Sequence, residues 1–262
     1  RGEVVHSECA GVLDRETGSP MPEDAIFRLY SMTKPITCVA LMMLYERGLL
    51  QLFDPVSKFI AAFADVKVHG GEFGVGEIDL EREITVHDLL THTSGLTYHT
   101  FEYGPVEAMY REARVCSTQP LADLVADLAR LPLAFQPGTA FRYSFAHDVV
   151  AHLVEILSDQ PFDHFLRENL FEPLGMLDTG FYVPEDKLDR FTAMYGSGDW
   201  NEPEMTITRW YDGTDNAIAR PRDCLESSPH NVLRGGVGLV STAADYLQFC
   251  RMMLNGGELE GT

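Results

Sequence analysis

The 262-residue sequence has few cysteines, few basic residues and no long apolar run, and each scarcity excludes a class of protein. Its five cysteines include no Cys-x-x-Cys pair, which excludes a disulfide framework or zinc ribbon and predicts reduced thiols: Cys9, Cys38, Cys116, Cys224 and Cys250. No stretch reaches the roughly 18 apolar residues that a membrane-spanning helix requires. With 20 Lys+Arg against 40 Asp+Glu, the formal net charge of −20 disfavours nucleic acids and anionic membrane surfaces as partners.

What the sequence does contain is enough apolar material, 45% of its residues, to build a sizeable core. The acidic residues are scattered along the chain, as in an acidic enzyme or binding protein. No signal peptide is visible, which favours the cytoplasm, although a leader upstream of Arg1 would leave the location open. Composition alone does not define the oligomeric state.

The pattern of apolar residues predicts mixed helices and strands without regular βαβ alternation, and therefore an α+β fold. We expect a strand over residues 2–11 and a turn over 17–23. The strongest helix is predicted over residues 31–47, apolar almost all round and closed by Gly48. Further helices are expected after Thr85 and over 121–131, 145–157, 162–171 and 242–254, whereas 69–76 and most of 183–230 suggest connecting segments.

Ser31 and Lys34 lie three residues apart at the start of the predicted 31–47 helix, so their side chains share one face. A serine hydroxyl is a poor nucleophile until a base accepts its proton, and a desolvated lysine can serve or assist in that step. A serine at a helix N-terminus also directs its own N–H towards a developing oxyanion. The alternative is that Lys34 extends from the helix end to solvent.

Tyr143 follows the Pro137-Gly138 turn and precedes a predicted helix. A tyrosinate near a cationic lysine can act as a general base, because the positive neighbour stabilises the phenolate. The alternative is a core aromatic with a satisfied hydroxyl. Other motifs are lacking: there is no Gly-x-Ser-x-Gly elbow and no His-Glu-x-x-His, and His147 and His152 do not share a helical face. We therefore expect no metal and no organic cofactor.

Five blocks carry a resemblance to a known family. They are Tyr30-Ser-Met-Thr-Lys-Pro-Ile-Thr, Leu89-Leu-Thr-His-Thr-Ser-Gly-Leu, Pro137-Gly-Thr-Ala-Phe-Arg-Tyr-Ser, Phe171-Glu-Pro-Leu-Gly-Met and Gly235-Gly-Val-Gly-Leu-Val-Ser-Thr-Ala-Ala-Asp. In this order they resemble serine hydrolases related to class C β-lactamases: family VIII carboxylesterases, penicillin-binding peptidases and lovastatin-type acyltransferases. The resemblance implies an antiparallel sheet flanked by helices, with an inserted mostly helical region and the active site between them.

By position, the resemblance implies that Ser31 is the acylated nucleophile, that Lys34 tunes proton transfer and that Tyr143 is the general base or acid. It implies a structural role for His92 and a packing role for the Gly235 block. Two departures stand out. Phe145 replaces the Asn of the usual Tyr-x-Asn motif, which favours the esterase or acyltransferase branch. The third motif, Lys/His-x-Gly or Trp-x-Gly, is missing.

These features predict a serine carboxylesterase that hydrolyses short-acyl esters through an acyl-Ser31 intermediate. The alternatives are an acyltransferase, a weak β-lactamase or DD-peptidase of the same family, or a non-catalytic binding module on this fold. We expect residues 1–262 to form one incomplete catalytic domain with a helical subregion at about 65–230. From the missing motif and ordinary domain size, roughly 100 residues are expected to be absent at the C-terminal side.

Overall fold

The structure is a computed structural model that describes residues 3–70, 76–99, 104–113, 115, 120–197, 207–209 and 233–261. The chain divides into two compact units. Unit 1 contains Arg1–Leu29, Arg167–Pro229 and Leu239–Thr262, and unit 2 contains Tyr30–Leu166 and His230–Gly238. Most of the connecting segment expected over 183–230, together with Cys116 and Cys224, lies outside the described residues. Cys9, Cys38 and Cys250 are free thiols.

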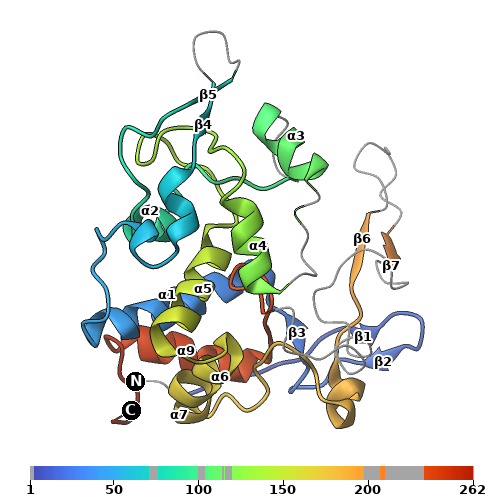
Figure 1. The fold of residues 1–262 in the computed structure, drawn as a ribbon. Helices are drawn as coiled ribbons and strands as arrows, with labels where there is room; N and C mark the ends of the chain where they lie inside the picture. Colours follow the sequence, from blue (N-terminus) through green and yellow to red (C-terminus); the bar gives the residue numbers. More distant parts are fainter. Residues whose placement is uncertain are drawn as a thin grey trace. The chain divides into compact units, whose positions relative to one another are not determined.

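Unit 2 is mostly helical, and helix α5 (Ala146–Ser158) lies among several of its other helices (Figure 1). α5 packs against α1, α2, α4 and α6. Its buried positions include Val149, Val150, Leu153 and Val154, which form the apolar face that the neighbouring helices cover. In chain order the helices of this unit are 3₁₀ helix η1 (Tyr30–Met32), α1 (Thr33–Glu46), 3₁₀ helices η2 (Val56–Lys58) and η3 (Ala61–Asp65), α2 (Val86–Leu90), α3 (Pro105–Glu112), α4 (Leu121–Leu128), α5 (Ala146–Ser158) and α6 (Phe162–Leu166).

Local sequence explains where α1 and α2 begin and end. Gly48 adopts a φ of +75° after α1, and the hydrogen bonds Gly48 N to Tyr45 O and Leu49 N to Leu44 O complete a Schellman closure. Thr85 caps α2, because its side chain accepts from the Asp88 N–H while the Asp88 carboxylate accepts from the Thr85 N–H. Both predicted helix boundaries are confirmed to within a few residues.

Unit 1 combines short strands with helices. Its helical elements are the π-helical turn η4 (Arg167–Phe171), α7 (Glu172–Leu174), 3₁₀ helix η5 (Glu185–Arg190) and α9 (Ala243–Leu254). Its strands form three antiparallel pairs: β1 (Val12–Asp14) with β2 (Ser19–Pro20), β3 (Phe27–Arg28) with β8 (Val240–Ser241), and β6 (Tyr195–Ser197) with β7 (Ile207–Arg209). Ile26, Val183 and Val240 form a buried cluster against which Leu188 and Phe191 pack.

The strands confirm the α+β class and correct its details. In unit 2, β4 (Val68–His69) pairs antiparallel with β5 (Glu77–Ile78), so the sheets of the described residues are four two-stranded ladders. The strand expected over residues 2–11 is wrong, because described residues 3–10 have no regular structure and the first strand begins at Val12. Those residues are exposed, so no buried face fixes them as a strand. No helix within the described ranges is long and apolar enough to cross a membrane.

Candidate active site

Ser31 lies in the 3₁₀ turn η1 that leads directly into α1, where its side chain is exposed. The preceding residue, Tyr30, has a φ of +46°, a left-handed conformation that is uncommon for a bulky side chain. Pro35 lies in the first turn of α1, where its missing N–H would have no intrahelical partner in any case. The local chain therefore presents the Ser31 hydroxyl at the N-terminal end of α1.

Lys34 is buried in the first turn of α1, with 6% of its surface exposed. Its Nζ donates to the Ser31 Oγ at 3.2 Å and to the backbone carbonyl of Gly236 at 2.8 Å. The alternative that Lys34 extends to solvent is wrong, because the amine turns inward to these two oxygens. The backbone of Gly236 thus holds Lys34 beside Ser31.

Tyr143 completes the group from a segment more than 100 residues away in the sequence. Its hydroxyl donates to the Ser31 Oγ at 2.7 Å, and its ring centroid lies 4.4 Å from the Lys34 Nζ. Ammonium groups are attracted to the face of an aromatic ring at this distance. The structure therefore brings Ser31, Lys34 and Tyr143 together, with the serine oxygen shared between the other two side chains.

Gly236 is positioned by a buried ion pair, which the sequence analysis did not identify. Arg234 Nε and Nη2 donate to the two carboxylate oxygens of Asp148 at 2.9 and 3.2 Å, and the Gly236 N–H donates to Asp148 Oδ1 at 3.1 Å. Arg234 is 2% and Asp148 0% exposed by side chain. The only signals in the sequence are an aspartate among apolar residues and an arginine before Gly-Gly. Neither signal shows that the two residues meet.

The Gly235 block has the packing role that the resemblance implies. A side chain on Gly235 would collide with the backbone oxygen of His147, and its Cβ would lie 2.6 Å from the Ala151 Cβ. Gly235 O also accepts from the Thr37 hydroxyl at 2.8 Å. Because α1 and α5 approach the glycine backbone this closely, any larger residue would separate them.

The 91–96 block supports the segment that carries Tyr143. Backbone carbonyls of this block accept from that segment: His92 O from Arg142 N at 2.9 Å, and Thr93 O from Gly138 N at 2.8 Å. Gly95 has a φ of +88°, and a side chain there would collide with the Phe135 backbone oxygen. The structural role implied for this block therefore has a geometric basis.

Two buried imidazoles lie beneath Tyr143. The His92 ring centroid is 4.6 Å from that of Tyr143 and 4.5 Å from that of His147. Burial, together with the nearby Lys34, lowers the pKa of His92 to about 4. Burial, His92 and Lys34 lower the pKa of His147 to about 3, against a small opposing effect of Asp148. Both rings are therefore neutral near pH 7.

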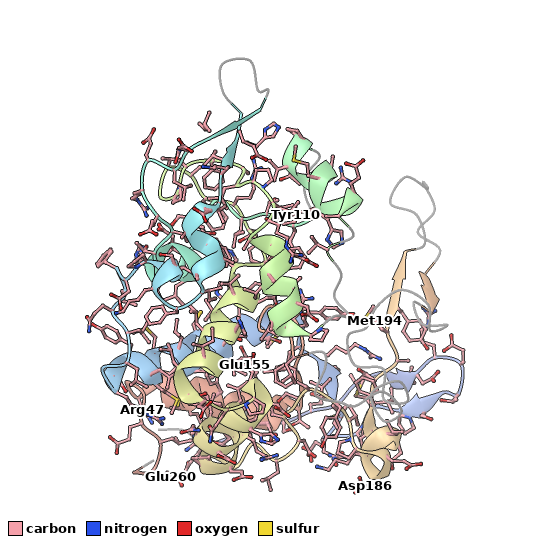
Figure 2. The ribbon with its side chains drawn as sticks, in the orientation of Figure 1. Arg47, Tyr110, Glu155, Asp186, Met194 and Glu260 are labelled. Carbon is pink, nitrogen blue, oxygen red and sulfur yellow. The ribbon has the colours of Figure 1, made fainter. Side chains whose placement is uncertain are left out.

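Phe145, at the third position of the Tyr-x-Phe segment, packs inward and is 3% exposed. Its ring centroid lies 4.3 Å from that of Tyr98 and 6.3 Å from that of Tyr110, which Figure 2 labels on α3. The Arg234 guanidinium lies 5.3 Å from the same ring. Position 145 therefore contributes packing where an asparagine would contribute an amide. Burial, followed by the charge of Asp148, raises the pKa of the neighbouring Tyr98 well above its ordinary value.

Among the side chains that the structure describes, no three His, Cys, Asp or Glu residues are placed to share a metal ion. The chemistry that the arrangement can perform is nucleophilic. A hydroxyl beside a tyrosine and a lysine can lose its proton to the phenolate form of the tyrosine, or to the neutral amine, as it attacks an electrophilic carbon.

Comparison with known proteins agrees with this fold. The Beta-lactamase family model matches residues 1–262. Protein Rv1367c of Mycobacterium tuberculosis is 36% identical over 265 residues, covering 100% of this chain and 62% of that protein. Esterase EstB of Burkholderia gladioli is 34% identical over 259 residues, covering 94% of this chain and 62% of the esterase.

A solved structure described as EstCE1, a hydrolase with promiscuous acyltransferase activity, superposes with a TM-score of 0.80 at 27% identity. The match covers 99% of this chain and 66% of that one. The fold is therefore of the β-lactamase and transpeptidase type, and the chain belongs to the beta-lactamase family. It spans about three fifths of the length of the curated relatives that it matches.

Proposed function

We propose that the protein is a serine hydrolase that cleaves short-acyl carboxylic esters through an acyl-Ser31 intermediate. One observation carries the proposal: the Ser31 Oγ lies 2.7 Å from the Tyr143 hydroxyl and 3.2 Å from the Lys34 Nζ. Both distances are within the reach that proton transfer requires. Esterase EstB and the EstCE1 hydrolase, which are similar to this chain, support the choice of an ester.

In the proposed mechanism Tyr143 acts as the phenolate, which the positive charge of Lys34 stabilises, and Ser31 Oγ attacks the ester carbonyl carbon while its proton passes to the phenolate oxygen. The carbonyl oxygen becomes an oxyanion, towards which the Ser31 N–H is directed. Collapse of this intermediate breaks the bond to the alcohol oxygen, which takes the proton from Tyr143 and leaves. Water then attacks the acyl-serine by the same steps, and the acid is released.

Phe145 supports ester over β-lactam substrates. Its phenyl ring packs against Tyr98, Tyr110 and Arg234. A phenyl ring carries no hydrogen-bond donor or acceptor for a substrate amide. Penicillins and cephalosporins carry an acylamido side chain, whose polar groups find no partner at this position, at a cost of about 1–3 kcal/mol if they are left unsatisfied. A simple ester lacks that side chain, and the penalty does not arise.

Acyl transfer to an alcohol is the second candidate. It uses the same acyl-Ser31 intermediate, with an alcohol in place of water, and the promiscuous acyltransferase activity in the description of EstCE1 favours it. A non-catalytic binding module is less well supported, because such a module has no need of a serine oxygen shared by a phenol and a buried amine.

The test is hydrolysis of a p-nitrophenyl ester series beside a chromogenic cephalosporin, combined with fluorophosphonate labelling. We expect the esters to be cleaved, the cephalosporin to persist, and Ser31→Ala to abolish both hydrolysis and labelling, because the acylated atom is removed. Mass spectrometry of the labelled protein should place the adduct on Ser31.

The matched control is Ser57→Ala, which removes a hydroxyl from η2 that bonds Glu83 and lies outside the site. This variant should label and turn over like the wild type. An adduct on another serine would refute the assignment of the nucleophile, and a preference for the cephalosporin would refute the choice of substrate.

A further inference from the structure

His92 contacts the segment that carries Tyr143 in three ways. Its ring packs against the tyrosine ring, with 4.6 Å between centroids. Its carbonyl accepts from the N–H of Arg142 at 2.9 Å, and its Nδ1 lies 3.1 Å from the Ser144 Oγ. One residue therefore holds Tyr143 and both of its sequence neighbours, although it lies about 50 positions earlier in the chain.

The two ring nitrogens of His92 differ in their partners. Nδ1 is paired with the Ser144 hydroxyl, which can donate or accept and so satisfies either tautomer. Among the described residues, Nε2 has no hydrogen-bond partner, in a residue that is 7% exposed. Such a buried polar group carries a cost that pure packing would avoid.

The backbone of His92 is also uncommon. Its φ of +56° is left-handed, a conformation that few residues other than glycine adopt, although histidine and asparagine tolerate it better than most. An apolar ring would remove the cost of the unpaired nitrogen. Strain and an unpaired polar atom at the same residue beside a reactive group are typical of a functional position.

The titratable groups that act on the ring come from two elements. Lys34 of α1 is one, and His147 of α5 is the other, with Asp148 acting through His147. An imidazolium in this place would repel Lys34, whose Nζ must remain between Ser31 and Gly236. A neutral ring supports the site without adding a competing charge.

We propose that His92 is a positioning residue for Tyr143: its ring, Nδ1 and carbonyl hold the tyrosine so that the phenol oxygen stays within proton-transfer distance of Ser31. The inference rests on the proposed function, in which Tyr143 is the general base. His92 itself touches no substrate. Its effect on turnover passes through the tyrosine.

The test uses His92→Asn in the purified protein with a p-nitrophenyl ester. Asparagine keeps an acceptor near Nδ1 and tolerates the left-handed backbone, but it removes the ring that supports Tyr143. A displacement of about 1 Å at a reacting group costs about 10²-fold, so we expect kcat to fall by that order while KM stays near the wild-type value. His152→Asn, on the same protein but bonded to Glu155, is the matched control and should turn over normally.

A double-variant cycle separates positioning from a general structural role. In the Tyr143→Phe background the phenol oxygen is already absent, so adding His92→Asn should cost little further turnover. If His92→Asn multiplies the loss of Tyr143→Phe, the proposal is overturned, because His92 then acts independently of the tyrosine. Ser144→Ala removes the Nδ1 partner from the other side and should give a smaller loss of the same kind, which keeps the proposal testable if His92→Asn does not fold.

The outcomes also separate this inference from the proposed function. Turnover that depends on Ser31 but persists undiminished in both His92→Asn and Ser144→Ala would overturn the positioning role and leave the esterase intact. Wild-type protein without Ser31-dependent turnover would overturn both. A loss of kcat in His92→Asn that vanishes in the Tyr143→Phe background would support the positioning role.

Discussion

Each unit contains an arginine that donates hydrogen bonds to an aspartate through two of its nitrogens. The two pairs, Arg234–Asp148 and Arg190–Asp178, differ in burial. In unit 2, Arg234 and Asp148 are 2% and 0% exposed by side chain. In unit 1, Arg190 and Asp178 are 20% and 21% exposed, and Lys187 also binds Asp178 at 2.6 Å. The buried pair has a further partner in the Gly236 N–H, and Gly236 O holds Lys34.

The difference in burial separates two uses of the same chemistry. Around Asp178, two cations share one carboxylate near solvent, where water can replace a lost partner. Around Asp148, no water can do so, and every hydrogen bond of the carboxylate fixes a backbone or side-chain position. The pair in unit 2 therefore determines the geometry of the site, whereas the pair in unit 1 mainly joins segments.

Removing the arginine from each pair tests whether burial determines what the pair does. Arg234→Met leaves Asp148 as an uncompensated buried charge, which should lower the free energy of unfolding by about 3–5 kcal/mol. It should also slow fluorophosphonate labelling of Ser31, because the Asp148 carboxylate that orients the Gly236 N–H is no longer held by the guanidinium. Urea unfolding and the labelling rate measure the two effects.

Arg190→Met is the matched control. Lys187 remains on Asp178, so this variant should lose about 1 kcal/mol or less and label at the wild-type rate. Equal losses of stability in the two variants would show that burial does not distinguish the pairs. Normal labelling in folded Arg234→Met would show that Asp148 orients Gly236 without help from Arg234.

Acid should lower the stability of the folded protein through His92. The unfolded chain binds a proton on His92 near pH 6.5, whereas in the folded site the pKa of His92 is about 4. The stability contributed by the neutral ring is therefore complete above pH 6.5 and lost as the pH falls towards 4, a change on the order of 3 kcal/mol. The two nearby cations of unit 1 lower the pKa of Asp178 to about 2, so its contribution is lost only below its ordinary value of 3.8.

His92→Asn should therefore reduce the decrease in unfolding free energy between about pH 6.5 and pH 4, as measured by urea titration at several pH values, and the decrease that remains comes from His147, whose pKa is about 3 in the folded site. Asp178→Asn should leave that window unchanged and flatten only the decrease below about pH 4. A wild-type protein whose stability is constant from pH 6.5 to 4 would contradict the assignment of a buried neutral His92.

Sequence predicted the local parts of the site well. Ser31 and Lys34 are one helical turn apart, and their meeting follows from the 3.6-residue period; Gly48 and Thr85 mark helix boundaries by their own backbone and side-chain chemistry. Tyr143 was identified through the resemblance of its segment to the family. Its place beside Ser31 depends on packing that the local pattern does not encode.

Long-range contacts were missed for the same reason. Nothing near Asp148 in the sequence indicates Arg234, 86 residues later, and nothing near Phe27 indicates its pairing with Ser241 in the β3–β8 ladder. Residues 2–11 were predicted as a strand from local composition alone. Because strand formation requires a partner, and described residues 3–10 have none, the local preference was insufficient.

We expect the smallest effects from removing the two threonine caps. These variants should lower the free energy of unfolding without altering the geometry of the site. Thr85 Oγ1 accepts from Asp88 N at 3.2 Å in unit 2, and Thr242 Oγ1 accepts from Asp245 N at 3.1 Å in unit 1. Thr85→Ala and Thr242→Ala should each cost about 1 kcal/mol, measured by urea unfolding, because one helical N–H loses its acceptor. The capping hydrogen bond of each threonine lies within the first turn of its own helix, so both variants should label at the wild-type rate. If Thr85→Ala slowed labelling as strongly as Arg234→Met, any loss of stability would disturb the site, and the special role of the buried pair would be refuted.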